Sequence, residues 1–230
     1  MADTKEPGAY VTARTLKEKT AHWLEKIEPF DRSGKSLQSL RSALLVIDMQ
    51  RYFVDPSGAA FLPSAQAILG NVQRLIKAFR RARRPVIYTR HMHHPGGLDA
   101  GILRDWWGDM IEEGTQDSEI HPSIAPHRDD KVIVKHRYSA FYGTDLETIL
   151  RVLEIKDVVI CGVMTNLCCE SSARDAFYRD YRTFFLADAT GTQSEEMHLA
   201  SLLNLAYGFA VITTAEELIS QMKGGNPGQE

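Results

Sequence analysis

The sequence predicts a three-layer α/β/α sandwich built on a parallel β-sheet. Six short apolar runs, rich in β-branched residues, alternate with longer segments of helical periodicity. An almost wholly apolar run is typical of a strand buried on both faces, and strands that alternate with helices form parallel sheets covered on both sides. With 230 residues, 43% of them hydrophobic, the chain is long enough to bury one such core.

Residues 1–42 are expected to lie outside this domain as an N-terminal extension with one helix. Leu16, Trp23, Leu24 and Ile27 fall near one helical face, and the polar stretch DRSGKS follows them. A helix of this length is marginal in isolation. We therefore expect its apolar face to pack on the domain or on a neighbouring subunit.

The domain itself is expected to span residues 43–218, and residues 219–230 are expected to form a C-terminal tail whose last residues, KGGNPGQE, are frayed. No internal repeat or low-complexity tract divides it. The predicted strands are Ala43–Asp48, Pro85–His91, Lys131–Lys135, Asp157–Val163, Thr183–Ala187 and Phe209–Thr213. The predicted helices are Ser64–Arg83, Asp145–Leu153, Leu167–Tyr178 and Ser194–Tyr207.

Charge and cysteine content limit the classes of partner. The net charge is -3, with 27 basic and 30 acidic residues interspersed, which gives no positive field for a nucleic-acid backbone. Three cysteines, two of them adjacent, do not make a disulfide framework, and no apolar stretch approaches the length of a membrane span. We expect a soluble cytoplasmic protein that acts on a small molecule and binds neither nucleic acid nor membrane.

Three reactive side chains follow predicted strands. Asp48 closes the run ALLVID, Lys135 closes KVIVK, and Cys168 follows VVICGV by one turn. Each has an ordinary explanation by itself: a turn residue, a solvated lysine, or a small buried thiol. However, ligands bind at the carboxyl ends of parallel strands, where these three would meet as nucleophile, proton acceptor and cation.

The two adjacent cysteines are expected to differ. Cys168 would lie in the first turn of a helix, where backbone N–H groups and the macrodipole favour the thiolate. Cys169 is interpreted as a small buried hydrophobic residue.

The chain resembles the isochorismatase-like hydrolase superfamily, also called the cysteine hydrolases. The matching motifs are LLVIDMQRYF at Leu44–Phe53, VKHRYSAF at Val134–Phe141, and GVMTNLCCESSARDAF at Gly162–Phe177. The resemblance covers about Ser42–Leu218 and implies a Rossmann-like fold with a six-stranded parallel sheet. It also implies a catalytic triad of Asp48, Lys135 and Cys168.

The same resemblance implies a cis peptide bond between Val163 and Met164, in the turn before the nucleophile. The N–H groups of Met164 and Cys168 would then point at a developing oxyanion, the kind of preorganised donor pair that acyl transfer uses.

The choice of nucleophile separates the branches of the superfamily. Isochorismatases cleave a vinyl ether by protonating it with the Asp; they resemble this chain in RYSAF and in LRDWWG at Leu103–Gly108, but commonly carry Gly at the position of Cys168. A thiol there favours cleavage of a C–N bond in an amide, ureide or carbamoyl group. Vinyl ether hydrolysis with Asp48 as acid stays as an alternative, as does a catalytically inactive binding or assembly protein of this fold.

Nicotinamidases of the superfamily add a metal site made of an Asp and two His after the second strand. Here His91 stands in place of the Asp and His93 occupies one His position, and two imidazoles make an incomplete site. We therefore expect no metal and no cofactor, and the departure argues against nicotinamide as the substrate.

Substrate contacts and assembly are the remaining expectations. Family enzymes are usually oligomers, so we expect a homodimer or homotetramer in which residues before Ser42 cover part of a subunit contact. The candidate substrate-binding residues are Phe53, His91, His93, Trp107, Tyr138 and Phe141.

Overall fold

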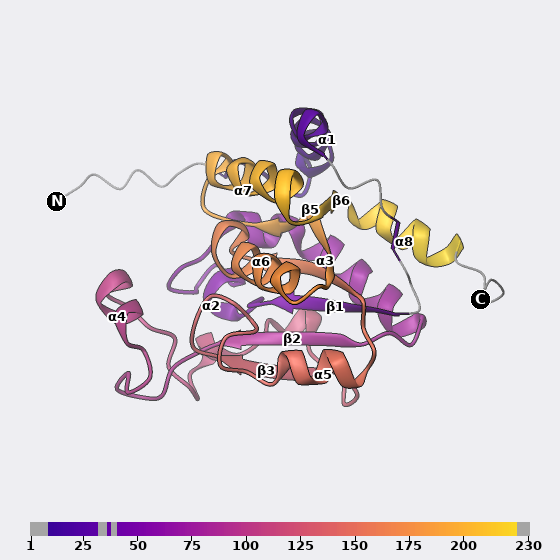
Figure 1. Ribbon diagram of the computed structural model, residues 1–230. Helices are drawn as coiled ribbons and strands as arrows, with labels where there is room; N and C mark the ends of the chain where they lie inside the picture. The colour runs from indigo at the N-terminus through magenta and orange to yellow at the C-terminus, as the bar shows by residue number, and fades with distance from the viewer. Residues whose placement is uncertain (1–8, 32–35, 38–40, 225–230) are drawn as a thin grey trace.

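The computed structural model describes residues 9–31, 36–37 and 41–224. Six parallel strands form one sheet in the order β3-β2-β1-β4-β5-β6 (Figure 1). Their bounds are β1 Ser42–Ile47, β2 Val86–His91, β3 Lys131–Lys135, β4 Asp157–Val163, β5 Arg182–Gly191 and β6 Val211–Thr213. The predicted fold class is therefore confirmed, with β5 longer and β6 shorter than predicted.

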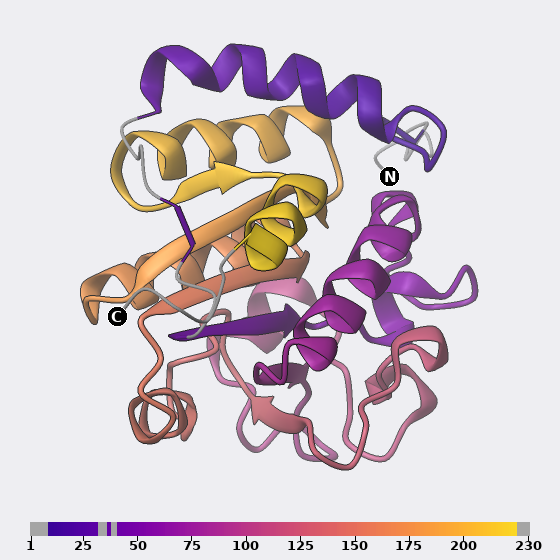
Figure 2. The ribbon, with the colours of Figure 1, turned by 90° about the vertical axis from the view of Figure 1, so that its right-hand side faces the viewer.

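Helices cover both faces of the sheet (Figures 1 and 2). On one face α3 packs on β5 and against α8, and α5, α6 and α7 lie on the other. The helix bounds are α2 Arg51–Val54, α3 Pro63–Arg81, α4 Ile102–Trp107, α5 Leu146–Val152, α6 Glu170–Tyr178, α7 Glu195–Gly208 and α8 Ala215–Gly224, with short turns η1 Glu28–Phe30, η3 Gln116–Ser118, η4 Pro122–Ile124 and η5 Thr165–Cys169.

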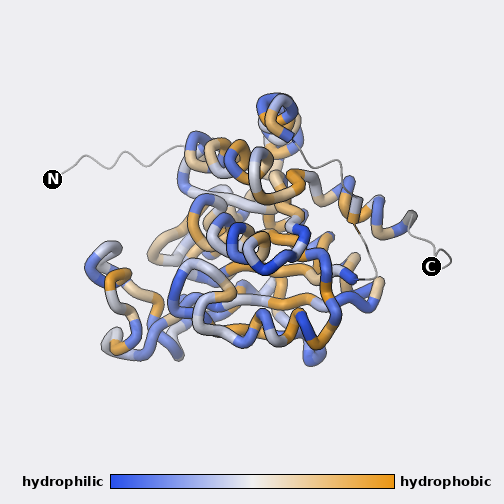
Figure 3. The backbone as a smooth tube through the Cα atoms, viewed as in Figure 1, coloured by the Kyte–Doolittle hydropathy of each residue, from blue (hydrophilic) through white to orange (hydrophobic). Residues whose placement is uncertain are grey.

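The core lies between these layers. Every residue of β1 and of β4 is buried, as expected for central parallel strands. Figure 3 shows the strands as largely hydrophobic and many of the outer turns and loops as hydrophilic. None of the helices among the described residues is long and apolar enough to cross a bilayer.

The N-terminal helix α1, Leu16–Ile27, packs on its own domain. Trp23 is only 1% exposed, its ring centroid lies 4.4 Å from that of His198 in α7, and its Nε1 donates a hydrogen bond to Glu195 at 2.8 Å. The apolar face of α1 is thus covered within one chain.

The prediction of a C-terminal tail is wrong for residues 219–224, the first six of the predicted segment. The helix α8 continues through residues 219–224, and Ile219 and Met222 pack against the core. The segment EELISQMK was too short and too polar to be recognised as a helix without its partner α3. Residues 225–230, and most of the predicted DRSGKS loop, lie outside the described residues.

Candidate active site

The three reactive side chains lie at the carboxyl edge of the sheet. Asp48 directly follows β1, Lys135 is the last residue of β3, and Cys168 lies in η5, the π-helical turn that joins β4 to α6. Strands β1 and β4 are neighbours at the point where the strand order reverses, which is where open α/β sheets form their ligand crevice.

Asp48 and Lys135 form a buried ion pair. Lys135 Nζ lies 2.7 Å from Asp48 Oδ2, and neither side chain is exposed. The other carboxylate oxygen, Oδ1, accepts a hydrogen bond of 2.6 Å from the Thr89 hydroxyl, which itself accepts from the Asp48 backbone N–H at 3.1 Å. Thr89 on β2 therefore fixes the orientation of the carboxylate.

The thiol of Cys168 completes the cluster. It is 6% exposed, and its Sγ lies within 4.8 Å of an Asp48 carboxylate oxygen and of a His91 ring nitrogen. Both Asp48 and Lys135 influence the protonation of this thiol. The structure thus brings together the three residues that the strand ends indicated.

Burial controls the protonation of the thiol. It raises the pKa of Cys168 to about 12, with Asp48 adding to the rise and Lys135 opposing it. For Lys135, burial lowers the pKa, but Asp48 and then Cys168 outweigh that effect and the net shift is upward. Burial therefore acts against the thiolate that the position of Cys168 at a helix start is expected to favour.

The turn before Cys168 has a backbone that few sequences allow. The Val163–Met164 peptide bond is cis. Gly162 has φ +118°, and a Cβ there would meet the Ile47 carbonyl oxygen at 2.0 Å, so only glycine fits where β4 passes β1. The use of the Met164 and Cys168 N–H groups as oxyanion donors stays a prediction.

The side chain of Ser172 connects the turn that carries Cys168 to the loop after β3. The Ser172 hydroxyl donates to the Cys168 carbonyl at 2.6 Å and accepts from the Ala140 N–H at 2.9 Å. Ser172 is fully buried, so the turn carrying Cys168 and the loop that follows Lys135 are held at a fixed separation.

A cavity of about 870 Å³ opens above the cluster. Five of the predicted substrate contacts line it: Phe53, His91, His93, Trp107 and Tyr138.

The sixth predicted contact, Phe141, does not line this cavity. It is 5% exposed, its ring stacks with Tyr181, and the Arg179 guanidinium lies 5.0 Å from its centroid. It is a packing residue, because the RYSAF segment turns inward after Tyr138.

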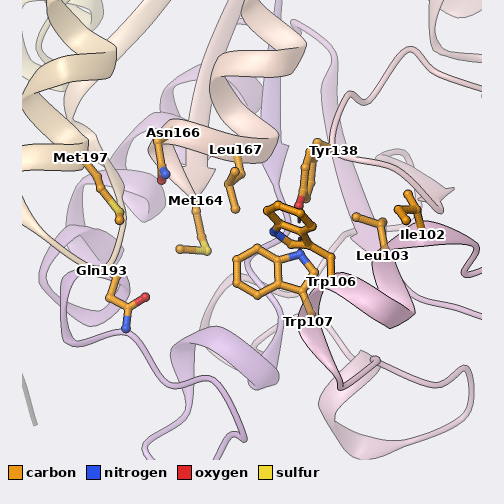
Figure 4. A pocket seen from close by; sticks show the side chains of 10 residues that line it. All are labelled: Ile102, Leu103, Trp106, Trp107, Tyr138, Met164, Asn166, Leu167, Gln193 and Met197. Carbon is orange, nitrogen blue, oxygen red and sulfur yellow. Dashed lines mark hydrogen bonds between the residues drawn. The ribbon is translucent and has the colours of Figure 1, made fainter. Parts of the chain in front are cut away.

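The outer part of the site is a further hollow of about 430 Å³ between α4 and the start of α7. Figure 4 shows Trp106 and Trp107 beside Tyr138 on one side, and Met164, Met197 and Gln193 on the other. Trp107 Nε1 donates to the Tyr138 hydroxyl at 2.9 Å, while Trp106 is 74% exposed.

Several wall residues were not predicted. Ala9 and Tyr10 of the N-terminal segment line the cavity, and the Tyr10 hydroxyl accepts from the Thr192 N–H at 3.3 Å. Tyr52 and Phe61 form part of another wall. Tyr52 follows Asp48 closely in sequence, which was the only available signal for it, and nothing in the sequence places Phe61 or Tyr10 there.

A histidine cluster, made of His91, His93, Asp99 and His136, adjoins the ion pair. His91 Nδ1 lies 3.3 Å from Lys135 Nζ, and its Nε2 lies 3.1 Å from His93 Nε2. His93 Nδ1 lies 3.2 Å from Asp99 Oδ1, and His136 Nδ1 lies 3.2 Å from Asp99 Oδ2.

The expectation that a metal site here would lack a third ligand is wrong. His93, Asp99 and His136 place one possible ligand atom each within 4.8 Å of the others, so a third ligand is not lacking. As arranged, however, these atoms are engaged with one another. His136 Nδ1 lies 2.7 Å from the Met92 carbonyl, which only accepts, so this nitrogen carries a proton and offers no lone pair.

The position of His91 next to Lys135 also disfavours a bound metal ion. It faces the Lys135 ammonium, which would repel a metal ion held by the same ring. The residues therefore do not fit a resident metal in this arrangement, and the absence of a cofactor stays a prediction.

The six-stranded parallel sheet with its flanking helices matches the fold of solved isochorismatase-like hydrolases. The pattern of the family described as "Isochorismatase domain" matches residues 42–217. The chain belongs to this family, and it is a hydrolase of that family.

Relatives in sequence and solved structures of similar fold both agree with this membership. The chain is 44% identical to "Nicotinamidase 3" of Arabidopsis thaliana over 186 residues, 80% of this chain and 89% of that one. A cysteine hydrolase from Pseudomonas syringae pv. phaseolicola 1448A superposes with TM-score 0.80 at 33% identity, covering 82% of this chain and 95% of that one. N-carbamoylsarcosine amidase from Thermoplasma acidophilum superposes with TM-score 0.68 at 33% identity, covering 76% and 97%.

Proposed function

We propose that this protein is an amidohydrolase that cleaves a C–N bond of a small molecule through a covalent acyl-enzyme on Cys168. The observation that carries the proposal is the thiol of Cys168, at the floor of the cavity beside the Asp48–Lys135 ion pair. The relatives named for nicotinamidase and N-carbamoylsarcosine amidase activity support this class of reaction.

In the proposed first half-reaction, Asp48 removes the thiol proton and Cys168 Sγ attacks the carbonyl carbon. The high pKa of the thiol means that this proton leaves only when an adjacent base receives it. Asp48 then returns the proton to the leaving nitrogen as the C–N bond breaks, and the acyl group stays on sulfur. Lys135 stabilises the negative charge that moves between Asp48 and Cys168.

In the second half-reaction, Asp48 takes a proton from water as the water oxygen attacks the thioester. Collapse of this intermediate breaks the C–S bond, and Asp48 gives the proton back to the sulfur. The acid product leaves and the thiol is restored, so atoms and protons balance over the cycle.

The cavity walls favour an uncharged substrate. They are mainly aromatic and aliphatic, and neither Lys nor Arg is among the described residues that line the cavity. Lys135 lies beneath the floor, and its charge is already paired with Asp48. A dicarboxylate such as isochorismate would therefore enter without a cationic partner, at a high desolvation cost.

The test is a panel of neutral amides, ureides and carbamoyl compounds with isochorismate included, followed by intact-mass analysis under slow turnover. An acyl mass increment that maps to the peptide containing Cys168 supports the proposal. Turnover of isochorismate without any adduct would instead establish vinyl ether hydrolysis, which needs only Asp48 as acid.

A further inference from the structure

The histidine cluster is continuous with the ion pair through a row of hydrogen-bonding atoms. It runs from Lys135 Nζ to His91 Nδ1 at 3.3 Å, from His91 Nε2 to His93 Nε2 at 3.1 Å, and from His93 Nδ1 to Asp99 Oδ1 at 3.2 Å. In each imidazole, one ring nitrogen contacts the neighbour on the side of the ion pair, and the other contacts the neighbour on the side of Asp99. Lys135 is fully buried, whereas the Asp99 side chain is 29% exposed.

The two ends of this row fix the direction of every hydrogen bond in it. An ammonium only donates and a carboxylate only accepts. His91 Nδ1 must therefore accept from Lys135, which places the His91 proton on Nε2. His93 Nε2 accepts that proton's hydrogen bond, and His93 Nδ1–H donates to Asp99. One pair of tautomers satisfies all three contacts, and the reversed direction satisfies neither end.

We infer that His91, His93 and Asp99 form a directional hydrogen-bond chain that positions the Lys135 ammonium for the Asp48–Cys168 pair. The three residues are positioning residues, since they act on the reacting thiol through Lys135. This inference rests on the proposed function of Cys168 and adds the residues that hold its cationic partner in place.

The contacts of Lys135 show what the chain contributes. Its ammonium has three N–H donors and three close polar neighbours: it donates to the Arg137 carbonyl at 3.0 Å, lies 3.3 Å from His91 Nδ1, and forms the ion pair with Asp48 Oδ2 at 2.7 Å. Three acceptors define the orientation of a tetrahedral group. Without the His91 acceptor, one buried N–H would lose its partner and the orientation of the ammonium would be less well defined.

The electrostatic surroundings keep His91 in the required neutral state. Burial, followed by the charge of Lys135 and the neighbours His93, His136 and Arg137, holds the pKa of His91 well below its usual value. A protonated His91 would present N–H to the ammonium and lose the contact.

The far end of the chain is also held in place. Asp99 accepts from the His94 N–H at 3.1 and 3.2 Å, and the Arg137 guanidinium donates to the Asp99 carbonyl at 3.0 Å. The carboxylate is thereby kept facing His93, so the tautomer of His93 is set by the fold and not by solvent.

The test uses the rate at which iodoacetamide alkylates Cys168, followed by peptide mass spectrometry between pH 6 and 10. This readout needs no substrate, so it remains informative whichever amide the enzyme cleaves. His93→Leu removes both ring nitrogens, whereas His93→Gln, of similar size, keeps one acceptor and one donor. His94→Leu is the control, because His94 precedes the chain in sequence but its ring bonds only the Pro95 carbonyl at 2.8 Å among the contacts described.

We expect His93→Leu to slow alkylation of Cys168 about tenfold near neutral pH, the effect of about one unit in the apparent thiol pKa. His93→Gln should retain most of the rate, and His94→Leu all of it. Asp99→Ala, which removes the fixed acceptor at the far end, should shift the rate in the same direction as His93→Leu and serves if that variant fails to fold.

Wild-type rates in folded His93→Leu and Asp99→Ala, or equal losses in the Leu and Gln variants, would overturn the inference. So would one equivalent of zinc in the purified protein that disappears in His136→Leu, because His93 Nδ1 cannot donate to Asp99 while it binds a metal. If no amide forms an acyl adduct but the His93 variants still behave as expected, the proposed function fails and the positioning chain stands.

Discussion

The Lys135 ammonium lies 2.7 Å from the Asp48 carboxylate, and both side chains are completely buried. Removing one partner of such a pair leaves an uncompensated buried charge, whereas the intact pair adds little net stability. The pair lies directly beside Cys168, which lines the cavity, and this position indicates a chemical role for the pair; the two residues are expected to contribute unequally.

Asp48→Asn is predicted to remove activity more completely than Lys135→Met. Asn cannot accept the thiol proton, and loss of a general base typically lowers kcat by about 10²- to 10⁴-fold. Met leaves the base in place but removes the cation that stabilises charge on Asp48 and Cys168. Steady-state kinetics on folded fractions of both variants make the comparison, and a Lys135→Met enzyme less active than Asp48→Asn would contradict the assigned roles.

Cys168→Ala is predicted to abolish turnover and adduct formation, while Cys169→Ala keeps most of the activity. The pair is a matched control, since the two thiols are neighbours in the same turn but Cys169 is fully buried and does not line the cavity. Activity assays and thermal unfolding of both variants provide the measurement. Equal loss of activity in two well-folded proteins would refute Cys168 as the nucleophile.

The strand ends made the centre of the site predictable from the sequence. Asp48, Lys135 and Cys168 each follow an apolar run, and parallel strands bring their carboxyl ends to one edge. The effect of burial on the thiol was not predictable: the helix position of Cys168 favours a thiolate, whereas burial, which only the fold reveals, raises the pKa of the thiol.

The walls of the site were predictable only in part. Trp107 and Tyr138 lie in the cavity as expected, but Phe141, three residues after Tyr138, turns into the core. Asp99 and Tyr10 reach the site from irregular segments without periodicity, and their positions depend on tertiary contacts that no local pattern encodes.

Chelation is predicted to leave activity unchanged. The reason differs from the one the sequence suggested: donors of the right chemical type are present around His93, but they are hydrogen-bonded to one another. Dialysis against EDTA followed by assay tests this, with metal analysis of the same samples. Activity that is lost and then restored by zinc, manganese or iron would disprove the metal-free mechanism.

Stability is predicted to fall as the pH drops from about 6.5 to 4, because of His198. Burial lowers the pKa of this histidine from 6.5 to about 4, and its Nδ1 lies 2.9 Å from the hydroxyl of Thr165 in η5. In the unfolded chain His198 takes up a proton near pH 6.5, whereas in the folded protein it does so only near pH 4. The contribution of neutral His198 to the free energy of unfolding is therefore complete above pH 6.5 and is lost as the pH falls from 6.5 to 4. The full loss is about 3 kcal/mol from this shift.

Denaturant unfolding at several pH values between 4 and 8 measures this dependence, with His198→Gln as the comparison. Asp188 titrates with the opposite sign, because burial raises its pKa to about 6 and its contribution is lost as the pH rises from about 3.8 through 6. The difference between wild type and His198→Gln isolates the histidine. Parallel curves for the two proteins would show that His198 is not the group responsible.

The last prediction concerns α1 and assembly. We still expect a homodimer or homotetramer, but the apolar face of α1 packs on α7 of its own chain and therefore needs no partner subunit. Trp23→Ala should lower the free energy of unfolding by about 3 to 5 kcal/mol, the usual cost of emptying a buried aromatic site, and leave the sedimentation coefficient unchanged. Lys26→Ala, on the exposed face of the same helix, should alter neither quantity. Denaturant unfolding and analytical ultracentrifugation of the three proteins decide the matter: a smaller species for Trp23→Ala with unchanged unfolding would mean that α1 holds subunits together after all.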